Sequence, residues 1–479
     1  AIKKGAKIIV TEKKIKRKDN TIFIRSTNVR KLLAIFSYKT LKKKPKKLIA
    51  VTGTNGKSSV SDFFFQILNL NSKRVASIGT IGIKQQNRKK ILKNTTLDPI
   101  QLTSVLKDLK KKKIEYVIME ASSHGLDQNR LDGLLFDIGI FTNLSHDHLD
   151  YHKNLRSYLK SKLYLFEKLL KRKGSIITDK YIPQRKKIEK IVSKKNIKVN
   201  LIFDAKNGIE VISHKFLNDK QILKIRFKEK TYQIILNLIG KIQLKNLLMA
   251  ILAAKKCGLK FKKIIKVLEK IKPVEGRLEK IGEIKNKSKV FLDYAHTPAA
   301  LELALTNIRE QFPGRKLSLV FGCGGERDLK KRSLMGKIAN EHADRIFLTD
   351  DNPRNEKPSK IRKEIKKSIK KNKIFEFPNR KKAISTAIEQ LNTGDLLLVA
   401  GKGHEKIQDY GKKKVFFSDS KEILEAIENK NKYLSKDLKL NIIKEVSKTN
   451  ISNDLVIKNI SINSKTIKKN DVFFAIKGK

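Results

Sequence analysis

The sequence predicts an α/β fold with mostly parallel sheets, and three observations support that prediction. Short apolar runs of the kind that form buried strands alternate with helical patterns along most of the chain. The alternation occurs in two series that meet near residues 272–276. A glycine-containing run at 53–58 joins the end of one strand to the start of a helix. At 479 residues, the chain is too long for one ordinary core, so we expect two or three domains.

The first series, together with the glycine-containing run at 53–58, predicts a central domain of the P-loop type over residues 45–272. Its sheet is expected to be mostly parallel because helical patterns separate successive strands. The strands are expected at Leu48–Thr52, Tyr116–Ala121, Ile138–Leu144 and Ser175–Thr178, with helices such as Ser59–Leu70 and Asn154–Leu170 between them.

The second series predicts a Rossmann-like α/β domain over residues 273–428. Its strands are expected at Val290–Tyr294, Leu317–Gly322, Arg345–Asp350 and Leu396–Ala400, and its helices at Pro298–Gln311, Ser359–Lys371 and Ala383–Leu391. Residues 1–44 resemble the end of a smaller domain. Residues 429–479 begin a new pattern after a polar stretch rich in lysine and asparagine.

The net charge of +62 allows two interpretations. One is nucleic-acid binding through phosphate contacts. The other is a lysine bias spread over every tolerant surface position. We favour the second, because the lysines run through all segments, are not interleaved with aromatic residues, and occur in a chain without tryptophan. We therefore expect no nucleic-acid partner, although a positive field attracts anionic substrates such as nucleotides.

Cysteine content and hydropathy favour a cytoplasmic protein that is not inserted in a membrane. The two cysteines, Cys257 and Cys323, lie in unrelated contexts and predict neither a disulfide framework nor a zinc site. The longest apolar run, Leu247–Ala254, is far shorter than the roughly 20 residues that span a bilayer. The first residues carry no charged-then-apolar leader.

The run Gly53-Thr54-Asn55-Gly56-Lys57-Ser58 predicts a phosphate-binding loop. Glycines let backbone N–H groups approach phosphate oxygens, and the following helix N-terminus adds positive potential. Lys57 would reach the β- and γ-phosphates, and the Ser58 hydroxyl would coordinate Mg²⁺. The strict P-loop pattern fails because Val51 stands where its first glycine belongs. The strand–loop–helix context nevertheless favours nucleotide binding over a plain turn.

Two polar segments, 119–126 and 142–152, contain four of the eight histidines and follow predicted strands. Open α/β sheets bind their ligands at the carboxyl ends of the strands. Glu120 and His148 are therefore candidate Mg²⁺ ligands beside Ser58. The alternative is a pair of surface loops with ordinary histidines, and two such loops beside a phosphate loop make the metal site the better prediction.

These three segments resemble motifs of the Mur ligase family, and the resemblance covers residues 1–428 in family order. It implies an ATP-dependent amide ligase of bacterial cell-wall synthesis. It assigns Lys57 and Ser58 to ATP and Mg²⁺, and Glu120 and His148 to metal binding. It also marks Lys162 as the lysine that CO₂ converts to a carbamate, an anion that helps to bind a second Mg²⁺.

The resemblance also implies the remaining contacts to the nucleotide and to the UDP-muramoyl substrate. Asn246 resembles an adenine-side asparagine, although Gln243 replaces the asparagine usual in that motif. Arg277 and Asp293 lie in segments that resemble those closing over ATP. The residues that resemble contacts to the UDP-muramoyl dipeptide are Asn94, Thr95, Thr96, Ser122, Gln128 and Arg130.

The tetrapeptide Asp351-Asn352-Pro353-Arg354 resembles the signature of ligases that select meso-diaminopimelate. Arg354 can hold the distal carboxylate of that amino acid bidentately. Glu405 with Gly401 would meet the distal ammonium, and Arg327 would assist on a carboxylate. The resemblance thus implies addition of meso-diaminopimelate to UDP-N-acetylmuramoyl-L-Ala-D-Glu through an acyl phosphate. The alternatives are a lysine-adding Mur ligase, a folylpolyglutamate synthase relative and, more remotely, a basic nucleic-acid-binding protein.

The two ends of the chain also resemble parts of this family. The run 1–7 resembles the second half of a UDP-binding N-terminal domain. The runs 462–465 and 471–478 resemble the opening of such a domain, with Asn463 and Lys465 at positions that differ from the family pattern. We expect either a fusion, in which the D-Ala-D-Ala-adding ligase of the same pathway begins near residue 435, or a circular permutation, and we favour the fusion.

Overall fold

The computed structural model describes residues 1–14, 21–86, 88–92, 94–193, 195, 197–435, 444–449, 457, 460–468 and 470–476. The chain forms two compact units, residues 1–274 and residues 275–479. The finer division into four segments stays a prediction. Of the tail segment at 471–478, residues 477 and 478 lie outside the described part.

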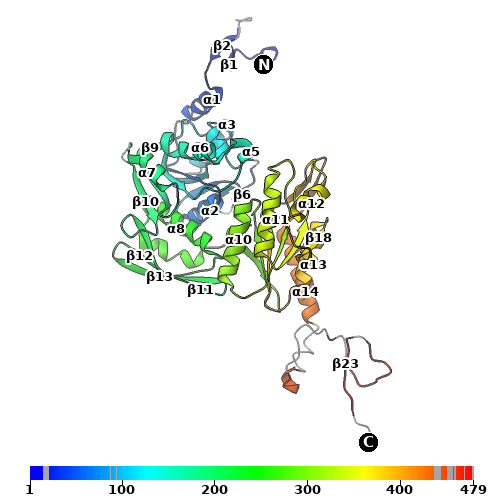
Figure 1. The fold of residues 1–479 in the computed structure, drawn as a ribbon. Coiled ribbons are helices and arrows are strands. Elements are labelled where there is room, and N and C mark those ends of the chain that lie inside the picture. The colour runs from blue at the N-terminus through cyan, green and yellow to red at the C-terminus, as the bar shows by residue number, and fades with distance from the viewer. Residues whose placement is uncertain are drawn as a thin grey trace. The chain divides into compact units, whose positions relative to one another are not determined.

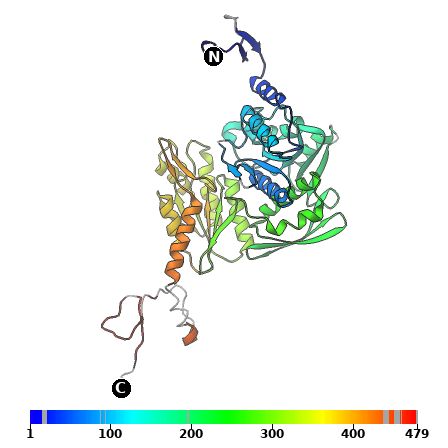
Figure 2. The same cartoon turned by 180° about the vertical axis from the view of Figure 1, so that it is seen from behind.

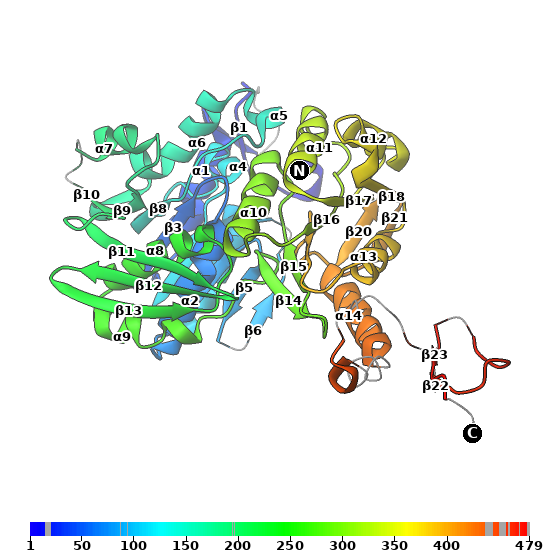
Figure 3. The same cartoon turned by 60° about the horizontal axis from the view of Figure 1, so that its bottom comes forward.

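The first unit is built on a sheet whose strands, among the described residues, run in the order β13-β12-β11-β10-β9-β8-β3-β7-β4-β5-β6. The strands from β10 to β4 pair in parallel, whereas β11, β12 and β13 form an antiparallel arm, visible in Figure 3. The strands are β3 (Lys47–Thr52), β4 (Val75–Gly79), β5 (Gly82–Gln85), β6 (Arg88–Lys90), β7 (Tyr116–Glu120), β8 (Phe136–Phe141), β9 (Leu170–Asp179), β10 (Lys198–Ile202), β11 (Gly208–Leu217), β12 (Lys220–Phe227) and β13 (Lys230–Leu236).

Helices cover both faces of this sheet because its central strands are apolar on both sides. In β3, Ile49 and Val51 belong to one core, and Leu48 and Ala50 belong to the other. The first core is closed by α2 (Lys57–Leu70), α8 (Lys241–Lys256) and α9 (Phe261–Ile265). The second core is closed by α1 (Val29–Lys39), α3 (Pro99–Lys111), α6 (Leu155–Lys168) and α7 (Arg185–Ser193) (Figures 1 and 2).

Short elements complete the first unit. Two of them, α4 (Ser123–Asp127) and α5 (Leu149–His152), follow β7 and β8 and carry the polar segments singled out in the sequence. The others are β1 (Ile8–Thr11), its parallel partner β2 (Ile22–Arg25), and the 3₁₀ turns η1 (Ile2–Lys4) and η2 (Leu268–Lys270).

The second unit holds a sheet of order β14-β15-β19-β16-β17-β18, parallel except at β14. Its strands are β14 (Glu279–Glu283), β15 (Lys289–Asp293), β16 (Leu317–Phe321), β17 (Arg345–Thr349), β18 (Ile374–Phe377) and β19 (Leu396–Ala400). The helices α13 (Arg380–Glu389) and α14 (Asp419–Ser435) close one core against this sheet. The helices α10 (Pro298–Gln311), α11 (Lys330–His342) and α12 (Pro358–Lys366) lie side by side (Figure 1).

The remaining elements of the second unit are η3 (Lys371–Lys373), the hairpin of β20 (Ile407–Tyr410) and β21 (Lys413–Phe416), and the parallel pair β22 (Ile460–Ser461) and β23 (Val472–Phe473). Among the helices of the described residues, none has the length and apolar content needed to cross a lipid bilayer.

The predicted α/β class with mostly parallel sheets is confirmed, and α10 and β19 have the predicted bounds. The strand expected at Ile138–Leu144 ends instead at Phe141, because residues 142 and 143 leave the sheet to contact the glycine-containing loop. The helix expected at Ser359–Lys371 begins at Pro358 and ends at Lys366.

Candidate active site

The loop between β3 and α2 is shaped by two glycines that no other residue could replace without strain. Gly53 has a φ of 148°, and a Cβ there would lie 1.8 Å from the Oγ1 atom of Thr142. Gly56 has a φ of 87°, and a Cβ there would lie 2.4 Å from the Oδ1 atom of Asn246. Val51 is a buried residue within β3, so the loop begins only at Gly53. This explains why the strict P-loop spacing is absent.

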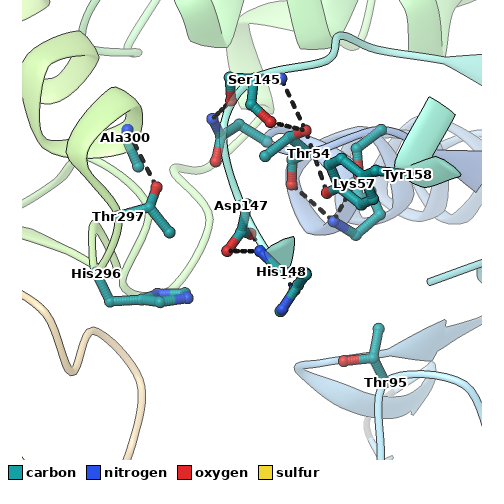
Figure 4. Close-up of polar contacts among 12 residues, drawn as sticks. Thr54, Lys57, Thr95, Ser145, Asp147, His148, Tyr158, His296, Thr297 and Ala300 are labelled. Atoms are coloured by element: carbon teal, nitrogen blue, oxygen red, sulfur yellow. Dashed lines mark hydrogen bonds and ion pairs between the residues drawn. The ribbon is translucent and has the colours of Figure 1, made fainter. Parts of the chain in front are cut away.

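The segment that follows β8 holds this loop in place. The backbone N–H of Thr54 donates to the Asn143 carbonyl at 3.0 Å, and that of Asn55 donates to the Asn143 Oδ1 at 2.9 Å. The Thr142 hydroxyl donates to the Asn55 carbonyl at 2.6 Å. Figure 4 shows Thr54 beside Ser145, whose N–H donates to the Thr54 hydroxyl at 3.0 Å. The loop conformation is therefore preset by backbone and side-chain contacts from the segment that follows β8.

Two lysine side chains converge on one carbonyl oxygen of the loop. The Lys57 ammonium donates to the Gly53 and Thr54 carbonyls at 2.9 and 2.7 Å. The Lys162 ammonium donates to the same Gly53 carbonyl at 2.7 Å, and its side chain is only 1% exposed. Burial first, and then the neighbouring charge of Lys57, hold the pKa of Lys162 well below its ordinary value, while Asp147 opposes the shift. Lys162 is thus a candidate for a neutral amine.

Glu120 ends β7 beside the loop. Strand register places it opposite Val51, and its side chain is 2% exposed. Its Oε1 accepts the Thr80 backbone N–H at 2.9 Å, and its Oε2 accepts the Thr80 hydroxyl at 3.0 Å. The Thr80 hydroxyl lies 3.0 Å from that of Thr95. The buried carboxylate is therefore connected to a residue expected to contact the muramoyl substrate.

The other expected substrate contacts form a hydrogen-bond network on the same edge of the sheet. The Thr96 hydroxyl donates to the Glu120 carbonyl at 2.8 Å and lies 3.0 Å from the Ser122 hydroxyl. The Arg130 guanidinium donates to the Thr96 carbonyl at 2.7 Å and to the Gln128 Oε1 at 2.6 Å. These side chains hold one another in position.

His148 lies in the loop after β8, with a φ of 54°. Its backbone N–H donates to the Asp147 Oδ1 at 2.9 Å (Figure 4), and its ring lies edge-on to that of His124 at 4.8 Å between centroids. The loops after β7 and β8 therefore meet through these two rings. Because β3 lies between β7 and β8, its glycine-containing loop, with Ser58 in the first turn of α2, begins at the same sheet edge.

Among the described residues, no group of three or more His, Cys, Asp or Glu side chains is placed to hold a metal ion. The chain supplies Glu120, His148 and the Ser58 hydroxyl near one sheet edge. The donor set consists mainly of hard oxygen ligands and fits Mg²⁺, which usually takes part of its coordination from phosphates and water.

In the second unit, Arg277 and Asp293 are neighbours. The Arg277 guanidinium lies 4.5 Å above the ring of Tyr294. The Asp293 Oδ2 accepts the Leu278 N–H at 2.6 Å. Burial raises the pKa of Asp293 to about 6, and the charge of Arg277 opposes that shift.

The Asp351–Arg354 segment lies against the glycine-containing turn after β19. A Cβ at Gly401 would lie 2.4 Å from the Asp351 Oδ2, so glycine permits the close approach. The Asn352 Nδ2 donates to the Glu405 Oε2 at 3.0 Å. Arg354, with a φ of 53°, donates to the Gly325 carbonyl at 2.6 Å. Pro353 directly precedes a turn at residues 354–355, and Arg327 is exposed.

Lys402 and Arg380 are among the buried cations of this unit that sequence reasoning missed. Lys402 is fully buried between Gly401 and Gly403 and contacts both Asn352 and Glu405. Arg380 is fully buried, donates to both carboxylate oxygens of Asp419 at 2.7 and 2.8 Å, and donates to the Ala400 carbonyl at 2.9 Å. Lys402 lies between the predicted site residues Gly401 and Glu405, but nothing in the neighbouring sequence indicated that it would be buried.

Comparisons with protein families and relatives agree along most of the chain. Residues 51–254 match the Mur ligase middle domain, and residues 276–403 match the Mur ligase glutamate ligase domain. The chain is 40% identical over 425 residues to the UDP-N-acetylmuramoyl-L-alanyl-D-glutamate--2,6-diaminopimelate ligase of Rickettsia bellii (strain RML369-C), covering 88% of each chain. It is 39% identical to the protein of the same name from Buchnera aphidicola subsp. Schizaphis graminum (strain Sg), covering 90% of this chain and 89% of the relative.

Solved structures give the same picture. A structure of a UDP-N-acetylmuramoyl-L-alanyl-D-glutamate--2,6-diaminopimelate ligase matches with a TM-score of 0.62 and 29% identity over 86% of both chains. A Mycobacterium tuberculosis folylpolyglutamate synthase complexed with ADP matches with a TM-score of 0.63 at 15% identity, over 78% of this chain and 91% of the other. The second likeness concerns the fold alone.

Proposed function

This chain belongs to the Mur ligase family, and from that premise we propose that it adds meso-diaminopimelate to UDP-N-acetylmuramoyl-L-Ala-D-Glu at the expense of ATP. The product would be a precursor of peptidoglycan. The proposal that the added amino acid is meso-diaminopimelate rests on the Asp351–Arg354 segment. In this segment, the Asn352 Nδ2 donates to the Glu405 Oε2 at 3.0 Å. The two free, buried cysteines fit a reducing cytoplasm as the location.

Lys57 and the loop are proposed to bind the phosphates of ATP. The loop leads into the N-terminus of α2, whose dipole favours an anion, and its glycines leave space that a Cβ would fill. The Lys57 ammonium contacts two loop carbonyls, from which it can turn to the β- and γ-phosphates. We assign Asn246, whose side chain lies against Gly56, to the nucleotide as well. Arg277 and Asp293 are assigned to ATP by resemblance.

Mg²⁺ would be held by Ser58, Glu120, His148 and a carbamate on Lys162. When bound, it neutralises the charge of the phosphate oxygens. Glu120 is buried with only Thr80 donating to its carboxylate oxygens among the hydrogen bonds described, so the carboxylate retains acceptor sites.

The environment of Lys162 supports the proposal of a carbamate there. A neutral amine attacks CO₂ to form R–NH–COO⁻ and releases one proton. Burial and the charge of Lys57 both favour the neutral amine, since they lower the pKa of Lys162. Conversion of this cation to an anion would also replace a repulsion with an attraction to Lys57.

The reaction is proposed to proceed through an acyl phosphate. The D-glutamate carboxylate attacks the γ-phosphorus of ATP and displaces ADP. The amine of diaminopimelate then attacks the activated carbonyl carbon, and inorganic phosphate leaves. The network of Thr95, Thr96, Ser122, Gln128 and Arg130 would hold the UDP-muramoyl dipeptide, and its preset hydrogen bonds reduce the entropy lost on orientation.

We assign the amino acid to the second unit. Arg354 would pair bidentately with the distal carboxylate of diaminopimelate, with Arg327 assisting. Glu405 and Gly401 would meet the distal ammonium, and Asp351, Asn352 and Pro353 would shape the pocket. L-Lysine lacks the distal carboxylate, so it would leave Arg354 without its partner and bind more weakly.

The experiment that tests this assignment replaces Arg354 with alanine and measures phosphate release with diaminopimelate. Loss of a charge-assisted bidentate contact of about 2–3 kcal/mol predicts a fall in kcat/KM of roughly 30- to 150-fold. The matched control is Arg345→Ala, at the opposite end of β17, where Nη1 donates to the Gln390 carbonyl. Normal diaminopimelate kinetics in Arg354→Ala would contradict the assignment.

A further inference from the structure

Lys402 is a fully buried lysine whose ammonium has a hydrogen-bond partner for each of its three N–H groups. It donates to the Asn352 Oδ1 at 3.1 Å, to the Glu405 Oε2 at 3.4 Å and to the Ile407 carbonyl at 2.6 Å. An ammonium without such partners would be very unfavourable in this position. The lysine therefore joins the segment after β17, which holds Asn352, to the segment from Lys402 to Ile407.

One consequence concerns the orientation of Asn352. Its Oδ1 accepts from Lys402 and also from the Asp409 backbone N–H at 3.0 Å. Because both lone pairs of the oxygen are used, the Nδ2 group must point the other way. There it donates to the Glu405 Oε2 at 3.0 Å. Lys402 and the Asp409 N–H together thus determine which end of the Asn352 amide meets Glu405.

A second consequence concerns the carboxylate of Glu405. Its Oε2 accepts from both Lys402 and Asn352, and its Oε1 accepts the Tyr294 hydroxyl at 3.1 Å. The carboxylate is held from three directions and cannot rotate without breaking a bond. The nearby ammonium of Lys402 also offsets part of its charge.

We propose that Lys402 is a positioning residue for amino-acid specificity, which orients Asn352 and Glu405 without contacting the substrate. This inference rests on the proposed function, in which those two side chains recognise the distal end of diaminopimelate. Without the ammonium, the Asn352 Oδ1 loses one of its two donors and the Glu405 Oε2 loses one of its two donors, so both side chains are held less firmly in the arrangement that meets the substrate. Loss of groups that orient ligand-binding side chains commonly weakens binding roughly 10- to 100-fold.

The test compares Lys402→Met with wild-type enzyme and with the control Lys289→Met. Methionine keeps the chain length but donates no hydrogen bond. Lys289 is also a buried lysine of the second unit, and its ammonium donates to the Glu283 Oε2 at 2.8 Å, away from the Asn352 and Glu405 contacts. For each protein, the KM for diaminopimelate, the KM for ATP, the ratio of kcat/KM for diaminopimelate to that for L-lysine, and the Tm are measured.

The expected result for Lys402→Met is a rise of about 10- to 100-fold in the KM for diaminopimelate, a lower selectivity over lysine and an unchanged KM for ATP. A lower Tm with unchanged KM and selectivity would overturn the inference, because a purely structural lysine behaves in that way. If Lys402→Met does not fold, Lys402→Arg is used, since a planar guanidinium cannot reproduce the three directions of the ammonium. The same KM shift is then expected. Failure of the proposed function is distinguishable, because wild-type enzyme would then release no phosphate with diaminopimelate.

Discussion

Replacement of Lys162 by methionine is predicted to remove both a carbamate and the ligase activity. Lys162 is buried beside Lys57, and both side chains donate to the Gly53 carbonyl. CO₂ reacts only with the neutral amine, so the extent of reaction depends on the pKa of this one side chain. Methionine fills a similar volume, contributes no charge and cannot react.

The direction of the effect follows from the lowered pKa of Lys162. At the ordinary lysine pKa of 10.5, only about 0.1% of the amine is neutral at pH 7.5, and each unit of lowering raises that fraction about tenfold. Burial, followed by Lys57, lowers the pKa of Lys162, so this lysine should carry carbamate far in excess of any surface lysine. The carbamate should increase as pH rises toward the pKa of the folded state and decrease below it.

The lowered pKa of Lys162 also predicts how the stability of the protein changes with pH, and the direction of the shift gives the sign of that change. Between the lowered pKa and 10.5, the folded state binds fewer protons at Lys162 than the unfolded state does. The contribution of this residue to the free energy of unfolding therefore rises with pH in that window, by about 1.4 kcal/mol per pH unit. This slope should be absent in Lys162→Met.

The assay is ¹³C NMR of the protein in ¹³C-bicarbonate, alongside phosphate release. Wild-type enzyme and the control Lys289→Met should show a protein-bound carbamate resonance that Lys162→Met lacks. The reasoning is refuted if Lys162→Met retains the resonance, or if active wild-type enzyme has none.

Three further predictions concern single substitutions. Lys57→Ala should lower phosphate release by at least about 100-fold through loss of charge stabilisation, and retained turnover would contradict its role. Gly53→Ala should abolish ATP binding in calorimetry, because its Cβ would lie 1.8 Å from a side-chain oxygen at a φ of 148°; tight binding would show that the loop tolerates the methyl. Asp419→Asn should destabilise the second unit by about 3–5 kcal/mol in chemical denaturation, since Arg380 is left buried without its charge partner; a change below about 1 kcal/mol would refute this.

Local chemistry made much of the framework predictable. The start of α10 is explained by a proline at its first position and by the preceding threonine, whose hydroxyl accepts the Ala300 N–H at 3.3 Å (Figure 4). The apolar runs of β3 and β19 signalled strands buried on both faces. The glycine-containing loop was predictable because its two glycines and Lys57 lie within five residues of one another, directly after an apolar run.

The burial of several charged side chains depends on contacts between residues that are distant in the sequence, so no neighbouring residues indicated it. Nothing near Lys402 in the sequence indicates that its ammonium meets Asn352, and the pair of Arg380 and Asp419 joins residues far apart along the chain. Lys162 was identified only by family resemblance, because a helical lysine is normally exposed. Its burial arises from packing of α6 against the loop, which no periodicity encodes.

Amino-acid-dependent product formation by wild-type enzyme tests the central claim most directly. The enzyme is incubated with ATP, Mg²⁺ and UDP-N-acetylmuramoyl-L-Ala-D-Glu, and with meso-diaminopimelate, L-lysine or no amino acid. The product mass and the released phosphate are then measured. We predict one phosphate released per diaminopimelate joined and a much lower rate with L-lysine. Equal rates with the two amino acids, or ATP hydrolysis without a heavier nucleotide product, would contradict the account.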